Sequence, residues 1–145
     1  MSLASTSTTA TGSNVPVLPV ARPTDNLSKV TSQYSDGLGL TLLLSFTEHE
    51  GFPGSIIGLP HAPYHLEFTT FTGEGHSPVT STPTEDNLLV FYIPDGEEWE
   101  TRVGKMTAAG WKEVKSFNPW WDREGITFED VDGYRVVLQK GIWNR

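Results

Sequence analysis

The triplet Leu66-Glu67-Phe68 meets Val136-Val137-Leu138 when the sequence is displaced by 70 residues along itself. The same displacement brings together residues that lie in strands, cap helices or end helices. These further pairs are Leu18 with Leu88, Asp25 with Asp95 and, within one residue, Gly39 with Gly110. Agreement of this kind at a fixed period indicates a structural repeat, even where few residues are identical. The sequence therefore predicts one module that is built twice.

Each half of the repeat carries the signals of one helix and four strands. The first half has an apolar, β-rich stretch at 15–22, then a helix capped by Thr24 or Asp25 and ended by Asp36-Gly37. Its remaining strands are expected at about 41–47, 54–59 and 63–71, where Gly and Pro punctuate β-rich runs. The second half has a strand at 87–93, a helix capped by Asp95 and ended by Ala109-Gly110, and strands near 112–117, 124–129 and 133–140. Each half is thus predicted to be a βαβββ module.

The two modules are expected to form a single domain over residues 15–145, with module one at about 15–71 and module two at about 87–141. Between them, 72–86 is rich in Gly, Ser, Thr, Pro and acidic residues, which is typical of a linker. Eight of the first thirteen residues are Ser or Thr, so 1–14 is predicted to be a disordered tail. This tail lacks the basic start and apolar run of a secretory signal, and a cytoplasmic location is expected.

Composition argues against several classes of function. The chain has 145 residues, no cysteine and a formal charge of −8, from 18 acidic and 10 basic residues. Without cysteine it cannot hold a thiolate metal site or use a Cys nucleophile. The acid excess argues against nucleic-acid binding, which needs clustered Lys and Arg, and the longest apolar run, 38–46, is too short for a membrane span. No nucleic-acid partner and no membrane partner is therefore expected.

Three motifs occur in the same order as in a known superfamily. They are Val20-Ala21-Arg22-Pro23-Thr24-Asp25-Asn26-Leu27, Tyr34-Ser35-Asp36-Gly37-Leu38-Gly39-Leu40 and Phe128–Leu138, the last with Val131 and Tyr134 where the superfamily has Pro and Asn. By these motifs, over about 15–141, the chain resembles the vicinal oxygen chelate superfamily of glyoxalase I, extradiol dioxygenases, fosfomycin-resistance transferases and bleomycin-resistance proteins. The resemblance implies an α+β fold in which two βαβββ modules form an open, cup-shaped, eight-stranded mixed sheet with helices on its outer face. It also implies a site inside the cup and a homodimer that pairs modules between subunits.

The resemblance further implies up to four cup positions at which superfamily enzymes hold a divalent metal with His or Glu. Carried onto this sequence they are Leu18, Glu67, Leu88 and Val137, of which only Glu67 is a ligand type. Because a divalent ion needs about three oxygen or nitrogen ligands, no metal and no other cofactor is predicted. A divalent metal is the alternative, held by Glu67, by His65 on the same strand face, and by His61 or His76.

Strand alternation extends the list of predicted cup residues. Leu66 and Phe68 would then face the helices, while an apolar floor and a few polar groups line the cup. The predicted floor consists of Leu18, Val20, Leu88, Val90 and Val137, and the polar groups are Arg22, His65, Glu67, Tyr92 and Arg135. A mostly apolar concavity with few polar anchors is typical of small-molecule sites. Arg22 or Arg135 is expected to pair with Glu67, either in place of the metal or as a ligand anchor.

Two adjacent tryptophans lie in a predicted turn between strands, within Ser116-Phe117-Asn118-Pro119-Trp120-Trp121-Asp122-Arg123. Large aromatic side chains on a loop are costly to leave in water, so they are expected to cover the cup mouth, a dimer seam or a sheet edge. We expect Trp120 or Trp121 to stack on a planar ligand, with Asn118 and Arg123 donating hydrogen bonds beside it. Lid packing without a ligand is the alternative.

The sequence as a whole favours a metal-independent protein of the glyoxalase and bleomycin-resistance type that binds a small, planar or aromatic molecule. The first alternative is an enzyme, such as a lyase, isomerase or dioxygenase, with Glu67 and His65 as metal ligands or as general acid and base. The second alternative is an interaction module with a vestigial cup. The predicted ligand-binding residues are Arg22, Tyr92, Asn118, Trp120, Trp121, Arg123 and Arg135.

Overall fold

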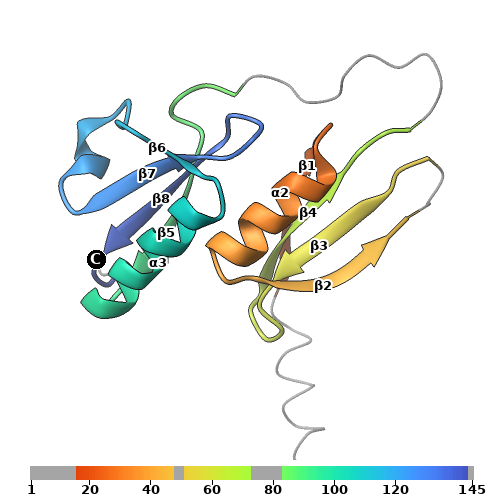
Figure 1. The fold of residues 1–145 in the computed structure, drawn as a ribbon. Helices are drawn as coiled ribbons and strands as arrows, with labels where there is room; N and C mark the ends of the chain where they lie inside the picture. The colour runs from red at the N-terminus through yellow and green to blue at the C-terminus, as the bar shows by residue number, and fades with distance from the viewer. Residues whose placement is uncertain (1–15, 48–50, 73–82, 144–145) are drawn as a thin grey trace, which may run out of the picture.

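The computed structural model describes residues 16–47, 51–72 and 83–143, which form two four-stranded sheets with their helices (Figure 1). The first module contains β1 (Leu18–Pro23), α2 (Leu27–Ser32), the π-helix η1 (Gln33–Gly37), β2 (Thr41–Phe46), β3 (Gly54–Gly58) and β4 (Tyr64–Thr69). The second contains β5 (Leu88–Ile93), α3 (Gly96–Ala108), β6 (Lys112–Val114), the 3-10 helix η2 (Pro119–Asp122), β7 (Gly125–Glu129) and β8 (Arg135–Lys140). The predicted α+β class and the two βαβββ modules are confirmed. The predicted tail, 1–14, and most of the predicted linker lie outside the described residues.

The two sheets have the same strand order and the same strand directions. The order is β1-β4-β3-β2 in the first sheet and β5-β8-β7-β6 in the second. In each sheet the first strand pairs in parallel with the last, and the other pairs are antiparallel. Among the described strands no hydrogen-bonded ladder joins the two sheets, so the arrangement is open and does not close into a barrel.

The two helices begin in different ways. Helix α3 begins as predicted, because the Asp95 side chain accepts the N–H of Glu98 at 3.2 Å. The cap predicted at Thr24 or Asp25 is wrong: the cap position is Asn26, and no side chain caps α2. Thr24 Oγ1 instead accepts the Asn26 N–H at 2.9 Å and donates to an Asp132 carboxylate oxygen in the second module at 2.7 Å. Of the helices in the described ranges, none is long and apolar enough to cross a membrane.

One hydrophobic core spans both modules. The Tyr34 ring is fully buried, with its centroid 4.9 Å from that of Phe68 and 4.8 Å from that of Trp111. The Trp111 indole N–H donates to the Gln33 carbonyl at 2.8 Å. The core cluster comprises Val30, Tyr34, Leu38, Leu40, Ile57, Leu66, Phe68, Met106, Trp111, Phe128, Val136 and Leu138. The modules are therefore halves of one packed unit.

Candidate functional site

Strand pairing fixes which side chains face the helices. The core buries Leu66 and Phe68 of β4 together with Val136 and Leu138 of β8. Because successive side chains of a strand point to opposite faces, Glu67 and Val137 point to the faces that the helices leave uncovered. The predicted superposition of the two triplets is therefore right in orientation, and so is the expectation that Leu66 and Phe68 face the helices.

The first strands of the two modules differ by one residue in register, which changes the predicted cup. β1 pairs Arg22 with Phe68 and Ala21 with Glu67, so Arg22 lies on the helix side of its sheet. The prediction that Leu18, Val20 and Arg22 share a face with Glu67 is wrong, because a one-residue shift moves every side chain of a strand to the other face. The second sheet keeps the predicted faces, with the pairs Leu88 and Arg135, Val90 and Val137, and Tyr92 and Gln139.

Glu67 does not receive the arginine partner that was predicted for it. Arg22 Nη2 lies 2.8 Å from Asp130 Oδ2. Arg135 Nη2 lies 3.0 Å from Glu129 Oε2 and 3.4 Å from Glu85 Oε2. Each arginine is thus paired within its own cluster, and half-buried Glu67 and His65 lie apart from both on the uncovered face of the first sheet.

The donor set of the described residues does not fit a divalent metal. Within the described ranges no group of three His, Cys, Asp or Glu side chains could hold an ion. His65 and Glu67 supply two donors on β4, whereas the uncovered face of the second sheet carries aliphatic Leu88, Val90 and Val137. His61 is exposed in the turn before β4, and His49 and His76 lie outside the described residues.

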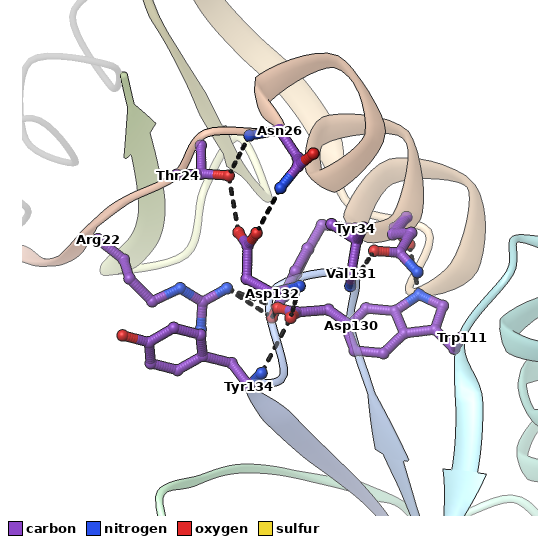
Figure 2. Close-up of polar contacts among 10 residues, drawn as sticks. Arg22, Thr24, Asn26, Tyr34, Trp111, Asp130, Val131, Asp132 and Tyr134 are labelled. Carbon is purple, nitrogen blue, oxygen red and sulfur yellow. Dashed lines mark hydrogen bonds and ion pairs between the residues drawn. The ribbon is translucent and has the colours of Figure 1, made fainter. Parts of the chain in front are cut away.

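A buried polar network joins the turn between β7 and β8 to the first module (Figure 2). Asp130 Oδ2 accepts hydrogen bonds from Arg22 and from the Tyr34 hydroxyl, each at 2.8 Å. Asp130 Oδ1 accepts the main-chain N–H groups of Asp132 and Tyr134, each at 2.9 Å. Burial raises the pKa of the Asp130 carboxyl, with Arg22 opposing the rise, and burial together with the Asp130 charge raises the pKa of Tyr34. Tyr34 therefore stays protonated and donates to Asp130.

The same turn makes further contacts with the start of the first helix (Figure 2). Asp132 accepts hydrogen bonds from the Thr24 hydroxyl at 2.7 Å and from the Asn26 side-chain amide at 2.9 Å. The Val131 N–H donates to Gln33 Oε1 at 2.8 Å. The closing motif found in the sequence is thus a docking turn that fixes the second module on the first.

A groove, here called the interstrand groove, lies between β1 and β5, which do not pair with each other. One half is a pocket of about 320 Å³ lined by Leu18, Val20, Tyr64, Leu66, Leu89, Val90, Phe91 and Tyr92. The other half, of about 350 Å³, shares Val20 and Leu89 and extends to Arg22, Leu88, Tyr134 and Arg135. Burial raises the pKa of Tyr64, which keeps its hydroxyl protonated. The groove gathers seven of the predicted cup residues, Leu18, Val20, Arg22, Leu88, Val90, Tyr92 and Arg135, and leaves out His65, Glu67 and Val137.

The predicted aromatic lid lies beside β7, outside the interstrand groove. None of Asn118, Trp120, Trp121 and Arg123 lines the two pockets of the groove. Asn118 Oδ1 accepts the Trp120 N–H at 3.0 Å and so caps η2, while the Arg123 guanidinium lies 4.9 Å from the Trp120 ring centroid. Stacking of Trp120 or Trp121 on a ligand stays a prediction.

Sequence reasoning missed three aromatic residues at or near the groove, Tyr64, Tyr134 and Trp143. Tyr64 lies two residues before Leu66 on β4, so strand alternation could have found it once β1 was placed correctly. Trp143 follows the last strand, is 69% exposed, and has its ring centroid 5.7 Å from that of Tyr92. No periodic signal points to Trp143, because it lies beyond the repeat.

Known proteins share this arrangement. The family model of the YycE-like N-terminal domain matches residues 18–69, and that of the YycE-like C-terminal domain matches residues 86–140. The uncharacterized protein YycE of Bacillus subtilis is 44% identical over 125 residues, covering 85% of this chain and 88% of that protein. The crystal structure of a YycE protein of unknown function from Bacillus subtilis has a TM-score of 0.78 and 41% identity, covering 90% of this chain and 95% of that one.

More distant structures share the fold alone. The fosfomycin resistance protein FosX from Mesorhizobium loti has a TM-score of 0.65 and 13% identity, covering 87% of this chain and 91% of that one. The antibiotic binding protein TnmS3 from a Streptomyces species has a TM-score of 0.60 and 16% identity, covering 87% of this chain and 95% of that one. The chain therefore belongs to the YycE-like family, and it shares its fold with glyoxalase-like and fosfomycin-resistance proteins.

Proposed function

We propose that this protein binds a small, neutral, planar molecule in the interstrand groove without the help of a metal. The observation that carries the proposal is the groove itself, two adjoining pockets of about 320 and 350 Å³ with mostly apolar walls and the tyrosines Tyr64 and Tyr92 at one end. Pockets of this size, mainly apolar with a few polar groups, are typical of small-molecule sites. The fold is also that of a protein named for antibiotic binding, which supports the same class of ligand.

The charges around the groove favour a neutral ligand. Both arginines that line it are already paired, Arg22 with Asp130 and Arg135 with Glu129 and Glu85. The carboxylates of Asp130, Glu129 and Glu85 would repel an anionic ligand, and an anion that displaced Asp130 would have to separate a buried ion pair, which costs several kcal/mol. The apolar end of the groove therefore supplies most of the binding free energy, through burial of ring surface.

The donor set of the described residues supports metal-independent binding, and acid–base chemistry has weaker support. Among the described residues, no third His, Asp or Glu lies close enough to His65 and Glu67 to complete a metal site. Neither lines the interstrand groove, so a ligand in the groove is out of reach of the acid and base that the enzyme alternative requires. Binding without turnover is the function that the geometry supports best. The homodimer and the cytoplasmic location stay predictions.

Thermal unfolding with matched neutral and anionic probes tests the proposal. The neutral probe is 2-quinolone and the anionic one is quinaldate, two fused-ring compounds of similar size. A ligand at about 100 times its Kd stabilises the folded state by about 2.7 kcal/mol, so 2-quinolone should raise the melting temperature. Quinaldate at the same concentration should raise it much less, and prior treatment with a chelator should change neither result.

Two alanine variants locate the binding. Tyr92→Ala removes a ring from the groove and should weaken 2-quinolone binding by about tenfold, since burying an aromatic side chain against a ligand contributes about 1–3 kcal/mol. Phe117→Ala removes an exposed ring that lines neither pocket of the groove and is the matched control, with unchanged binding expected. Equal loss in the two variants, or no stabilisation by any planar compound, would contradict the proposal.

A further inference from the structure

The backbone of β1 turns a nearly donor-free edge toward the interstrand groove. The N–H groups of Leu18 and Thr24 donate to the carbonyls of Pro63 and Thr69, each at 2.9 Å, so the main chain of even-numbered positions faces β4. The odd-numbered positions, Pro19, Ala21 and Pro23, therefore face the groove, because alternate residues of a strand direct their N–H and C=O groups to opposite sides. Proline has no N–H. Within β1, Ala21 is the single residue that can offer a donor to this side.

The backbone of β5 turns a complete edge toward the same groove. The Ile93 carbonyl accepts the N–H of Gly141 at 2.9 Å, so the odd-numbered positions of β5 face β8. The main chains of Leu88, Val90 and Tyr92 therefore face the groove with both their N–H and C=O groups. No strand pairing in the described part of the chain uses this edge.

The prolines explain why the groove stays open. Two facing edge strands would ordinarily pair and close a continuous sheet, and proline on an edge prevents this by removing the donors. With Pro19 and Pro23 directed at the groove, β1 cannot form a regular ladder with β5. The free N–H and C=O groups of β5 are consequently left for another partner.

We propose that a ligand of the groove completes the free edge of β5. The class of ligand is a planar molecule that carries a hydrogen-bond donor and acceptor on one edge of its ring, as a lactam does, and pairs with the N–H and C=O of Val90. This inference rests on the proposed function, since it needs the groove to be the binding site.

The side chains on either side of the groove suit a ring in this position. A molecule bonded to the β5 edge lies in the plane of the sheet, so its two faces are directed toward the helix side and the uncovered side. The pocket presents Leu66, Leu89 and Phe91 on the helix side, and Val90 and Tyr92 on the uncovered side. A planar ring is thus held between two apolar layers while its polar edge meets the backbone.

Amide hydrogen exchange in the ligand-free protein tests the free edge directly. The amides of Val90 and Tyr92 should exchange at least about tenfold faster than those of Leu89 and Phe91, which donate toward β8. Saturating 2-quinolone should slow the exchange of Val90 and leave that of Leu89 unchanged. Equal protection of all four amides in the ligand-free protein would overturn the inference.

A donor-blocked ligand and a donor-blocked strand test the pairing itself. N-methyl-2-quinolone lacks the ring N–H and should bind roughly tenfold more weakly than 2-quinolone, because the carbonyl of Val90 loses its partner. Val90→Pro removes the Val90 N–H on the side that faces away from β8, where an edge strand tolerates proline, and should weaken 2-quinolone to a similar extent. Val90→Ala keeps the N–H and is the control, so its loss should be smaller than that of Val90→Pro.

The outcomes separate the two proposals. Equal binding of 2-quinolone and its N-methyl derivative, with equal affinities for Val90→Pro and Val90→Ala, would overturn recognition by the β5 edge and leave the groove as the binding site. Absence of binding by both compounds to the unmodified protein would contradict the proposed function. If Val90→Pro does not fold, the two ligands and the exchange pattern still decide the question.

Discussion

Removal of the Asp130 carboxylate tests a buried ion pair between the two modules. Asp130→Ala takes away the acceptor of hydrogen bonds from Arg22 and Tyr34 at 2.8 Å and from the N–H groups of Asp132 and Tyr134 at 2.9 Å. The Asp130 side chain is fully buried and that of Arg22 is 12% exposed. The variant therefore leaves a largely buried guanidinium without its carboxylate.

The expected cost is large compared with the stability of a domain. Breaking a buried ion pair by removing one partner costs about 3–5 kcal/mol, because the remaining charge is buried without compensation. The free energy of unfolding of a native domain is about 5–15 kcal/mol. Asp130→Ala is thus expected to lower it by about 3–5 kcal/mol. The double variant Arg22→Met, Asp130→Ala leaves neither charge of the pair. Its loss of unfolding free energy should therefore be about 1–3 kcal/mol smaller than the sum of the losses in the two single variants.

Urea unfolding followed by tryptophan fluorescence measures these free energies. The control is Glu100→Ala, which removes an exposed carboxylate from α3 and should change stability by no more than about 0.5 kcal/mol. A loss below about 1 kcal/mol for Asp130→Ala, or strict additivity in the double variant, would refute the reasoning that this pair holds the modules together.

Three further predictions concern titration, packing and metal. The pKa of Tyr34 lies above its ordinary value of 10.0 in the folded protein, so the unfolded chain ionises first. The free energy of unfolding should therefore fall as the pH rises above about 10, and Tyr34→Phe should reduce that slope in alkaline urea titrations. A Cβ at Gly37 would lie 2.5 Å from Trp111 Nε1, so Gly37→Ala should cost about 1–3 kcal/mol. Gly104 on α3 has no atom within 4 Å of such a Cβ, so Gly104→Ala should instead raise the melting temperature. Equimolar manganese should change the melting temperature of the wild type and of Glu67→Gln by the same small amount. A manganese-induced rise that is seen in the wild type and lost in Glu67→Gln would contradict metal independence.

Much of the fold could be predicted because its signals are local and occur twice. Alternation around Glu67 and Val137 is a property of single strands, and the cap at Asp95 is a property of one turn, so both were predicted correctly. The cap at Thr24 was not, because its hydroxyl is used by Asp132, which lies far away in the sequence. Local patterns cannot report such long-range competition for a side chain.

The site was harder to predict for a related reason. In each module the first strand pairs with the last, but the register of this pairing differs by one residue between the modules. Leu18 pairs with Tyr64, whereas Leu88, which lies 70 residues further along, pairs with Arg135. A single displacement of 70 residues cannot fit both pairs, so it placed Arg22 on the wrong face. The ion pair of Arg22 with Asp130 then depends on how the modules dock, which no strand pattern contains.

The shared core has a consequence for the order in which the chain can fold during synthesis. Tyr34 packs on Trp111 and donates to Asp130, so when it leaves the ribosome the first module alone cannot cover the whole tyrosine ring or accept its hydroxyl proton as Asp130 does. Contacts between residues this far apart in the sequence form late, and until they form the first sheet keeps part of its apolar surface in water. We therefore expect a nascent chain that ends before Trp111 to be a substrate for chaperones, and folding to be completed in one step once the turn at Asp130 has been made.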